Sequence, residues 1–196
     1  MVVGVAGKYC SGKSTVAEIL EESGFIHIDV DKLGHGALAR RKDTIVERFG
    51  NEILTPETGD IDRRRLGRLV FSDVDRLRAL EEIVHPEMRR MTNETIEANP
   101  RRDIVINAAI LFPMGLDELC DGVFWVTAPL LQRLCRARAR DRHSLGQLMR
   151  RFRAQRALSP QQSRHEVDIV TVRNASNKES LRRRVLEGLS CFGSPS

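Results

Sequence analysis

The chain lacks the features that mark membrane-spanning and secreted proteins. Its 196 residues contain no apolar run that approaches the roughly 20 residues needed to cross a bilayer. The N-terminal segment MVVGVAG has no basic stretch ahead of a long apolar one, so it does not read as a signal peptide. We therefore expect a cytoplasmic protein that does not associate with membranes.

Cysteine is scarce, and its spacing argues against a structural metal. The four cysteines, at positions 10, 120, 135 and 191, form no C-x-x-C pair and have no histidine cluster beside them. A zinc site needs such a group of ligands. We expect reduced thiols in a cytosolic protein, with Cys10 as a small filler inside a loop.

The chain is basic, but the excess charge is local. The net charge is +5, and nine arginines lie between positions 133 and 156. Such a cluster fits either nucleic acid or small anionic substrates. Phe152 is the only aromatic residue in the cluster, so no platform for base stacking is indicated. A nucleic-acid-binding NTPase stays an alternative, and we expect no nucleic-acid partner.

Short apolar segments alternate with helical ones. Buried parallel strands are predicted at 2–6, 25–29, 103–112, 121–127 and 167–172, and helices at 14–22 and 177–189. Residues 32 to about 99 are mostly helical, with apolar Leu66, Leu69, Val70 and Phe71 on one face and a helix end at His85-Pro86. This alternation predicts an α/β fold with a five-stranded parallel sheet.

The segment GKYCSGKST, at 7–15, fits the phosphate-loop pattern G-x-x-x-x-G-K-[ST]. A strand precedes it and a helix follows it, which is the context that the pattern requires. Backbone N–H groups of such a loop point at phosphate oxygens, and the helix N-terminus adds positive charge. Lys13 would reach the β- and γ-phosphates of ATP, and the Ser14 hydroxyl would hold Mg²⁺.

Two carboxylates follow the second strand. Asp29 and Asp31 are two residues apart, so on a continued strand they would share a face. The carboxyl ends of parallel strands form the binding crevice of such folds. Asp31 is the candidate to accept a proton from an attacking hydroxyl, or else it caps the next helix. Asp29 is a candidate partner of Lys13 or Mg²⁺.

The arginine cluster contains a second candidate group. Arg136 and Arg140 are four residues apart and share a helix face. Arginines neutralise charge on a transferring phosphoryl group, and a lid that carries them excludes water. The alternative is a solvated basic face. The phosphate loop in the same chain favours an arginine-bearing lid.

Together these motifs resemble the dephospho-CoA kinase family from end to end. The motifs occur in the same order as in the family: GKYCSGKST, IDVDKLGH, GDIDRRRLGRLVF, LRALEEIVHPEM, a strand ending AILF, RARARD, RAQR and VDIVTVRN. The block at 59–86 is the most discriminating, because P-loop kinases in general do not share it. The chain departs from the family at Ala6 (usually Thr), at Lys8 (usually a second Gly) and at AILFP, where the family has PLLFE.

The resemblance implies a P-loop kinase that transfers the γ-phosphoryl group of ATP to the ribose 3′-hydroxyl of dephospho-CoA, the last step of coenzyme A synthesis. It implies an ATP loop made of Cys10, Ser11, Gly12, Lys13, Ser14 and Thr15. Asp31 matches the family's proposed base and Arg140 a lid arginine. Arg63 and His85 fall on motifs of the region that receives dephospho-CoA, and Asn174 falls near the adenine of ATP.

The resemblance also implies one domain over 1–196, acting as a monomer. Its core would span about 1–31, 101–130 and 166–196, a helical CoA-binding subdomain about 32–100, and an arginine-rich lid about 131–165. The departures at Ala6 and Pro113 motivate a second hypothesis, a P-loop kinase for another small acceptor such as a nucleoside monophosphate.

Overall fold

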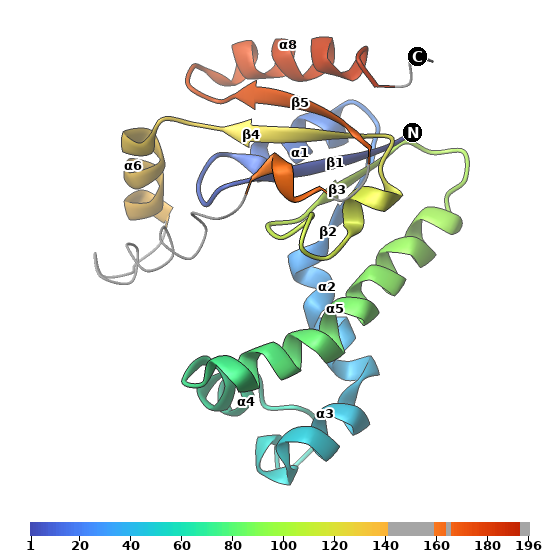
Figure 1. Ribbon diagram of the computed structural model, residues 1–196, viewed down its shortest axis with the longest axis vertical. Helices are drawn as coiled ribbons and strands as arrows, with labels where there is room; N and C mark the ends of the chain where they lie inside the picture. Colours follow the sequence, from blue (N-terminus) through green and yellow to red (C-terminus); the bar gives the residue numbers. More distant parts are fainter. Residues whose placement is uncertain (141–158, 164–165, 193–196) are drawn as a thin grey trace. The chain divides into compact units, whose positions relative to one another are not determined.

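Five short strands form one parallel sheet in the computed structural model, which describes residues 1–140, 159–163 and 166–192 (Figure 1). The strand order is β2-β3-β1-β4-β5, and all four pairings are parallel. The strands are β1 (Val2–Gly7), β2 (Ile26–Asp29), β3 (Ile104–Asn107), β4 (Gly122–Thr127) and β5 (Asp168–Arg173). The predicted five-stranded parallel sheet is confirmed.

The sheet forms because its central strands are apolar on both faces. Val3 and Val5 of β1 pack in one core with Ile19 and Leu20 of α1 (Lys13–Glu22). The same core includes residues of α8 (Lys178–Leu189), so α1 and α8 cover one face of the sheet. On the other face, a Cβ at Gly4 would lie 2.9 Å from Cδ1 of Leu111. Parallel strands need this cover on both faces.

Asp29 and Asn99 bound a second compact unit. The chain divides into a sheet unit, Met1–Asp29 with Asn99–Ser196, and a helical unit, Val30–Ala98. The sheet unit also contains η2 (Leu116–Leu119), α6 (Leu130–Arg140) and η3 (Pro160–Gln162). The helical unit consists of α2 (Val30–Arg40), α3 (Lys42–Phe49), η1 (Asn51–Ile53), α4 (Arg63–Phe71) and α5 (Val74–Glu97).

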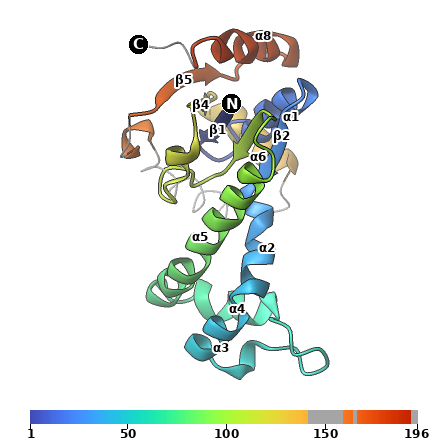
Figure 2. The same ribbon diagram turned by 90° about the vertical axis from the view of Figure 1, so that its right-hand side faces the viewer.

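Within the helical unit, α2 and α5 lie side by side (Figures 1 and 2). Glycines on α2 permit this approach: a Cβ at Gly36 would lie 2.9 Å from Cε of Met91. The N-termini of α4 and α5 are capped by Asp62 and Asp73, whose carboxylates accept backbone N–H bonds of the first turn.

The helix end predicted at His85-Pro86 is wrong, because α5 continues through Pro86 to Glu97. Proline removes one hydrogen bond and usually ends or kinks a helix. Here Val84, Glu87 and Met88 are buried on either side of Pro86. We infer that this packing holds both halves of α5 in one helix.

Two further expectations need correction. The strand predicted at 103–112 ends at Asn107, and residues 109–113 form turns, so AILF does not end a strand. Those apolar residues are still buried, as Leu111 and Phe112 show, which explains why periodicity extended the strand. Phe71 was placed on a buried face with Leu66, but it is 78% exposed at the end of α4.

No helix in the described ranges combines the length and the apolar composition needed to cross a bilayer. All four cysteines are free thiols.

Candidate active site

The loop between β1 and α1 has the backbone geometry of a phosphate cradle. Cys10 has a φ of 57° and Gly12 a φ of 100°, both in the left-handed region. Such conformations are costly for most residues and gather at functional loops. Glycine is needed at position 12 for a second reason, because a Cβ there would collide with the side-chain amide of Asn174.

Side chains from outside the loop bind its carbonyl oxygens. Nε of Arg133 donates to the Tyr9 carbonyl at 2.8 Å, and Nδ2 of Asn174 donates to the Ser11 carbonyl at 3.0 Å. Nη1 of Arg136 also donates to the Ser11 carbonyl, at 3.2 Å. Carbonyl oxygens repel phosphate, so their engagement by these donors suits a loop whose N–H groups face an anion.

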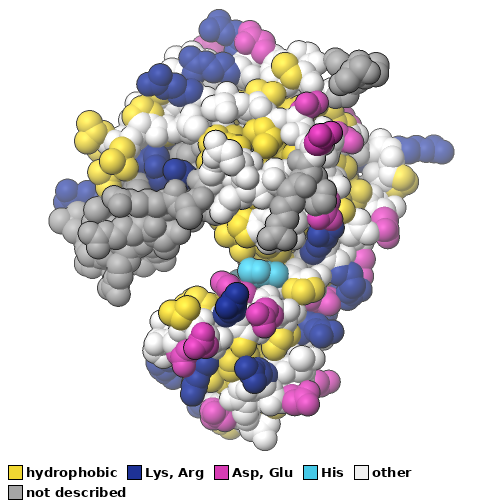
Figure 3. Space-filling model, in the orientation of Figure 1, with side chains coloured by type: hydrophobic (Ala, Val, Ile, Leu, Met, Phe, Trp, Pro, Cys, Tyr) yellow, Lys and Arg dark blue, Asp and Glu magenta, His cyan; other side chains and the backbone are white. Residues whose placement is uncertain are grey.

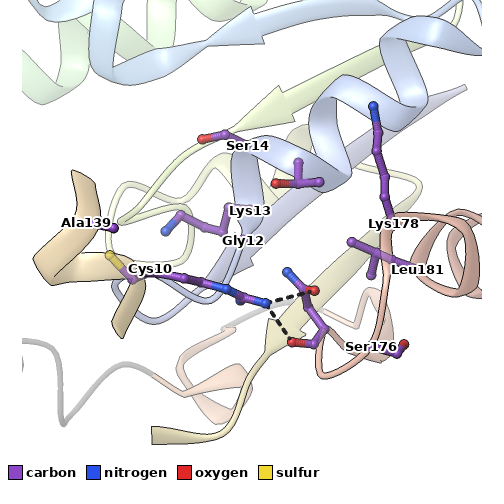
Figure 4. Close-up of a pocket in the computed structure, with 11 residues that line it drawn as sticks. Cys10, Gly12, Lys13, Ser14, Ala139, Ser176, Lys178 and Leu181 are labelled. Carbon is purple, nitrogen blue, oxygen red and sulfur yellow. Dashed lines mark hydrogen bonds between the residues drawn. The ribbon is translucent and has the colours of Figure 1, made fainter. Parts of the chain in front are cut away.

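A pocket of about 670 Å³ lies beside this loop (Figure 4). Its walls come from residues 10 and 12–15 of the loop and α1, from Arg136 and Ala139 of α6, and from Asn174, Ser176, Lys178 and Leu181. In Figure 4 the Lys13 side chain extends toward Ala139 and Cys10, and Ser14 projects from the start of α1. The volume suits a nucleotide-sized ligand, and the α1 N-terminus favours its phosphates.

Of the predicted nucleotide-binding residues, only Ser11 does not line this pocket: the structure gathers Cys10, Gly12, Lys13, Ser14, Thr15, Arg136 and Asn174 there. Asn174 is buried. Nη2 of Arg136 donates to both the side-chain and the backbone oxygen of Asn174 at 3.3 Å, the dashed lines in Figure 4. These two residues therefore brace each other and the loop through Ser11. The sequence offered no signal for this pairing.

The lid lies largely outside the described residues. Arg140 is the last residue of α6, and its side chain is outside the described part, as are residues 141–158. The first helix of the predicted lid, α6, is anchored to the phosphate loop. Ala137 and the ring of Tyr9 are buried together, with Cys10 and Leu134 packed against them.

Asp31 belongs to the helix that follows the second strand, so it does not share a strand face with Asp29. β2 ends at Asp29, and Asp31 is in the first turn of α2 with its side chain exposed. A carboxylate in the first turn of a helix is stabilised by the helix dipole. On α2, Asp31 shares its face with His35, which is four residues further on.

The predicted Arg63 is brought onto the same face of the helical unit. Nη1 of Arg63 donates to Nε2 of His35 at 2.6 Å, because a guanidinium has donors and no acceptor. Sequence reasoning assigned no role to His35, although its spacing of four from Asp31 was a usable signal. The helical unit thus presents a carboxylate, an imidazole and a guanidinium together.

His85, also predicted to contact substrate, is half-buried on α5. Burial lowers the pKa of its imidazole, while the charge of Glu81 acts in the opposite direction. The lowered pKa favours the uncharged imidazole at neutral pH.

Ion pairs hold α2 to α5 behind these groups. Arg40 of α2 pairs with Glu87 at 3.5 Å and with Glu94 at 2.8 Å, and Arg90 contacts both carboxylates. The hydrogen bond from Arg90 is the main cause that lowers the pKa of Glu87. Figure 3 shows acidic and basic side chains interspersed over the visible face of this unit.

A Mg²⁺ ion would find few protein ligands here. In the described ranges, no group of three or more His, Cys, Asp or Glu residues is placed to hold a metal. The Ser14 hydroxyl does line the nucleotide pocket, and Mg²⁺ in kinases is bound by few protein oxygens together with substrate phosphates. The residues present therefore fit a metal that arrives with ATP.

Comparisons with known proteins agree with this geometry. The family model described as dephospho-CoA kinase matches residues 1–179. A dephospho-CoA kinase of Moorella thermoacetica is 39% identical over 161 residues, which cover 79% of this chain and 76% of that protein. One of Bacillus licheniformis is 33% identical over 194 residues, covering 95% and 96%. The crystal structure of TT1252 from Thermus thermophilus superposes with a TM-score of 0.80 at 31% identity, covering 100% and 98%.

Proposed function

The chain belongs to the dephospho-CoA kinase family, and from that premise we propose how its residues divide the family's reaction between them. The reaction transfers the γ-phosphoryl group of ATP to the 3′-hydroxyl of dephospho-CoA and yields coenzyme A and ADP. The observation that carries the assignment of residues is the 670 Å³ pocket, whose walls contain the phosphate loop.

ATP occupies this pocket with its phosphates against the loop. N–H groups of Cys10, Gly12, Lys13, Ser14 and Thr15 form the cradle, and the Ser11 N–H holds the shape of the loop through its 3.0 Å bond to the Lys8 carbonyl. The Lys13 ammonium neutralises charge on the β- and γ-phosphates. Asn174 and Arg136 form the wall on the far side of Gly12, where we place the adenosine part. Because their polar groups bind each other, their role is to shape this wall and to hold Ser11.

The Ser14 hydroxyl is the ligand that we assign to Mg²⁺, together with phosphate oxygens of ATP. When bound, the ion supplies positive charge at the oxygens between which the phosphoryl group moves.

Dephospho-CoA binds to the face of the helical unit that carries Asp31, His35 and Arg63. The Asp31 carboxylate accepts the proton of the 3′-hydroxyl as its oxygen bonds to the γ-phosphorus. The bond from that phosphorus to the bridging oxygen of ADP breaks, and ADP leaves with the electron pair. Arg63, a cation held by His35, suits the phosphates of the acceptor, and neutral His85 suits a hydrogen-bonding contact with it.

We assign Arg140 to the transferring phosphoryl group and residues 131–165 to a lid that excludes water. Support comes from α6, whose anchoring through Arg133 and Arg136 leads directly from the phosphate loop to Arg140. We further infer that the protein is a monomer and works in the cytoplasm. We also infer that it does not bind nucleic acid, because two polyanionic substrates account for the positive net charge.

The decisive assay measures ADP release by the purified protein with ATP and a panel of acceptors. We expect release with dephospho-CoA well above the ATP-only background, and less with nucleoside monophosphates. A preference for a nucleotide acceptor would support the alternative substrate, and no release with any acceptor would contradict the kinase assignment. Size-exclusion chromatography tests whether the protein is a monomer. A filter-binding titration at increasing salt tests whether it binds nucleic acid.

A further inference from the structure

A second cavity of about 480 Å³ lies on the opposite side of the phosphate loop from the nucleotide pocket. It is lined by Lys8 and Ser11 of the loop, residues 125–128 at the end of β4, Arg133 of α6, and Ser159 and Pro160. Among the described residues the two cavities share no lining position, because positions 10 and 12–15 of the loop line one and positions 8 and 11 line the other.

The charges around this cavity have one sign. Lys8 and Arg133 are cations, and the described lining contains no carboxylate. The bond from Arg133 Nε to the Tyr9 carbonyl holds the guanidinium against the loop. Burial lowers the pKa of Arg133, which shows that its charge is partly removed from water. Two cations that face one cavity raise its potential and favour an anion as ligand.

The loop wall also contains an unsatisfied polar atom. Ser11 is fully buried, and its Oγ has no hydrogen-bond partner in the described part of the chain. A Cβ built on Gly7 would contact both this Oγ and the carbonyl oxygen of Val126, so the hydroxyl lies on the β4 side of the loop. Buried hydroxyls are nearly always paired, so an orphan of this kind calls for an explanation, and an anion bound in the cavity would supply one.

We propose that this cavity is a second anion site, which takes a phosphate group of a small molecule through Lys8, Arg133 and the Ser11 hydroxyl. Its described lining differs from that of the ATP pocket, and the proposal rests on the proposed function to the extent that the acceptor is one source of the phosphate. The phosphate could belong to the diphosphate of dephospho-CoA or to a separate phosphate ester, and the two sources share the same recognition chemistry.

The site carries its own reporter, because Trp125 is the only tryptophan of the chain and lines the cavity. The experiment first loads the full-length protein with a non-hydrolysable ATP analogue and Mg²⁺, so that the nucleotide pocket is filled. The binding of the analogue is measured separately, and its failure would count against the proposed ATP site alone. Labelled inorganic pyrophosphate is then added in equilibrium dialysis, in parallel with a titration of Trp125 fluorescence.

We expect saturable pyrophosphate binding to the loaded protein, with Lys8→Gln weakening it at least ~10-fold and Lys8→Arg restoring most of it. Arg138→Gln is the matched control, because it removes one exposed positive charge from α6 outside the cavity. Absence of saturable binding to the loaded wild-type protein, or equal binding by Lys8→Gln and Arg138→Gln, would overturn the proposal.

A competition arm identifies the source of the phosphate. If dephospho-CoA displaces pyrophosphate from the loaded protein, the site holds the diphosphate of the acceptor. If both bind together, the site serves a separate phosphate ester. Either result supports a second anion site, provided that pyrophosphate binding is weakened in the Lys8→Gln protein.

Discussion

Buried apolar side chains stabilise both the sheet unit and the helical unit, and the two units differ in what their described polar contacts hold. The central strands of the sheet unit are apolar on both faces. The carbonyl oxygens of its phosphate loop accept hydrogen bonds from Arg133, Arg136 and Asn174. In the helical unit, Arg40 of α2 is joined to α5 by ion pairs with Glu87 and Glu94.

This difference indicates which of the two units tolerates substitution of its side chains. Phosphate binding in the sheet unit depends on backbone N–H groups, which any side chain at positions 8 or 9 leaves in place. We assign acceptor binding in the helical unit to side chains such as Asp31 and Arg63, whose positions follow from helix packing. The predictions below test each half of this contrast.

The largest effect is expected for Lys13→Ala, which removes the cationic side chain that we assign to the β- and γ-phosphates. Turnover should fall roughly 10³-fold, because a fixed positive charge at the moving phosphoryl group is lost. The coupled ADP-release assay measures it. Lys178→Ala is the control, since it removes a cation of the same pocket that pairs with Glu22, and it should cost far less. A loss for Lys13→Ala no greater than for the control would contradict the assigned role.

Asp31→Asn tests the corresponding side chain of the helical unit. Turnover should fall at least ~10²-fold with little change in KM, because the proton acceptor is lost while the shape is kept. Asp43→Asn is the matched control, being an exposed aspartate in the first turn of α3. Near-wild-type turnover of Asp31→Asn would refute a general base at this position.

Asn174→Ala tests whether the tethers of the loop matter as much as its backbone. The variant leaves the Ser11 carbonyl without its 3.0 Å bond and Arg136 without one acceptor. The KM for ATP should rise about 10-fold. Asn177→Ala removes only the cap of α8, so it should lower stability without raising that KM. Equal KM values in the two variants would mean that the tether is dispensable.

Glu87→Gln tests the ion pairs of the helical unit. At pH 7 the free energy of unfolding should fall by about 1–3 kcal/mol, because a 7% exposed carboxylate loses charged hydrogen bonds. The folded-state pKa of Glu87 is lowered, so its contribution is present above the ordinary pKa of glutamate and is lost as pH falls through the folded value. The gap between wild type and variant should therefore shrink in acid.

Thermal unfolding followed by circular dichroism measures that gap at neutral and acidic pH. Glu82→Gln is the control, because Glu82 is exposed and pairs with Arg78 only at 3.8 Å, and it should change little at either pH. A gap that widened in acid would show that the buried carboxylate is not stabilised by its arginines.

The smallest effect is expected for Phe71→Ala, because the apolar spacing of α4 groups Phe71 with Leu66 although Phe71 is exposed. Because the ring is 78% exposed, the free energy of unfolding should change by less than about 0.5 kcal/mol. Leu66→Ala, on the buried face of the same helix, should cost about 2–5 kcal/mol. Chemical denaturation measures the free energy of unfolding of both variants. Equal losses would show that the Phe71 ring contributes to the core as much as Leu66 does.

Several errors of prediction have one cause, which is that local patterns do not reveal packing. Pro86 reads as a helix end, yet buried neighbours on both sides carry α5 through it. The apolar run at 103–112 reads as one strand, yet β3 ends at Asn107 and the rest is buried in turns. Asp31 reads as a strand residue, yet α2 begins at Val30.

The sequence by itself determined the sheet, the phosphate loop and residues that line the pocket beside that loop. Strand periodicity and the G-x-x-x-x-G-K-[ST] spacing are local properties, and the loop acts through a backbone that those few residues shape. Only the tertiary structure decided that Asn174 braces Ser11, 163 residues away, and that Arg63 meets His35. It also decided that Lys8 and Arg133 line one cavity. Such contacts join distant positions, and they depend on how side chains fill space once the chain has folded.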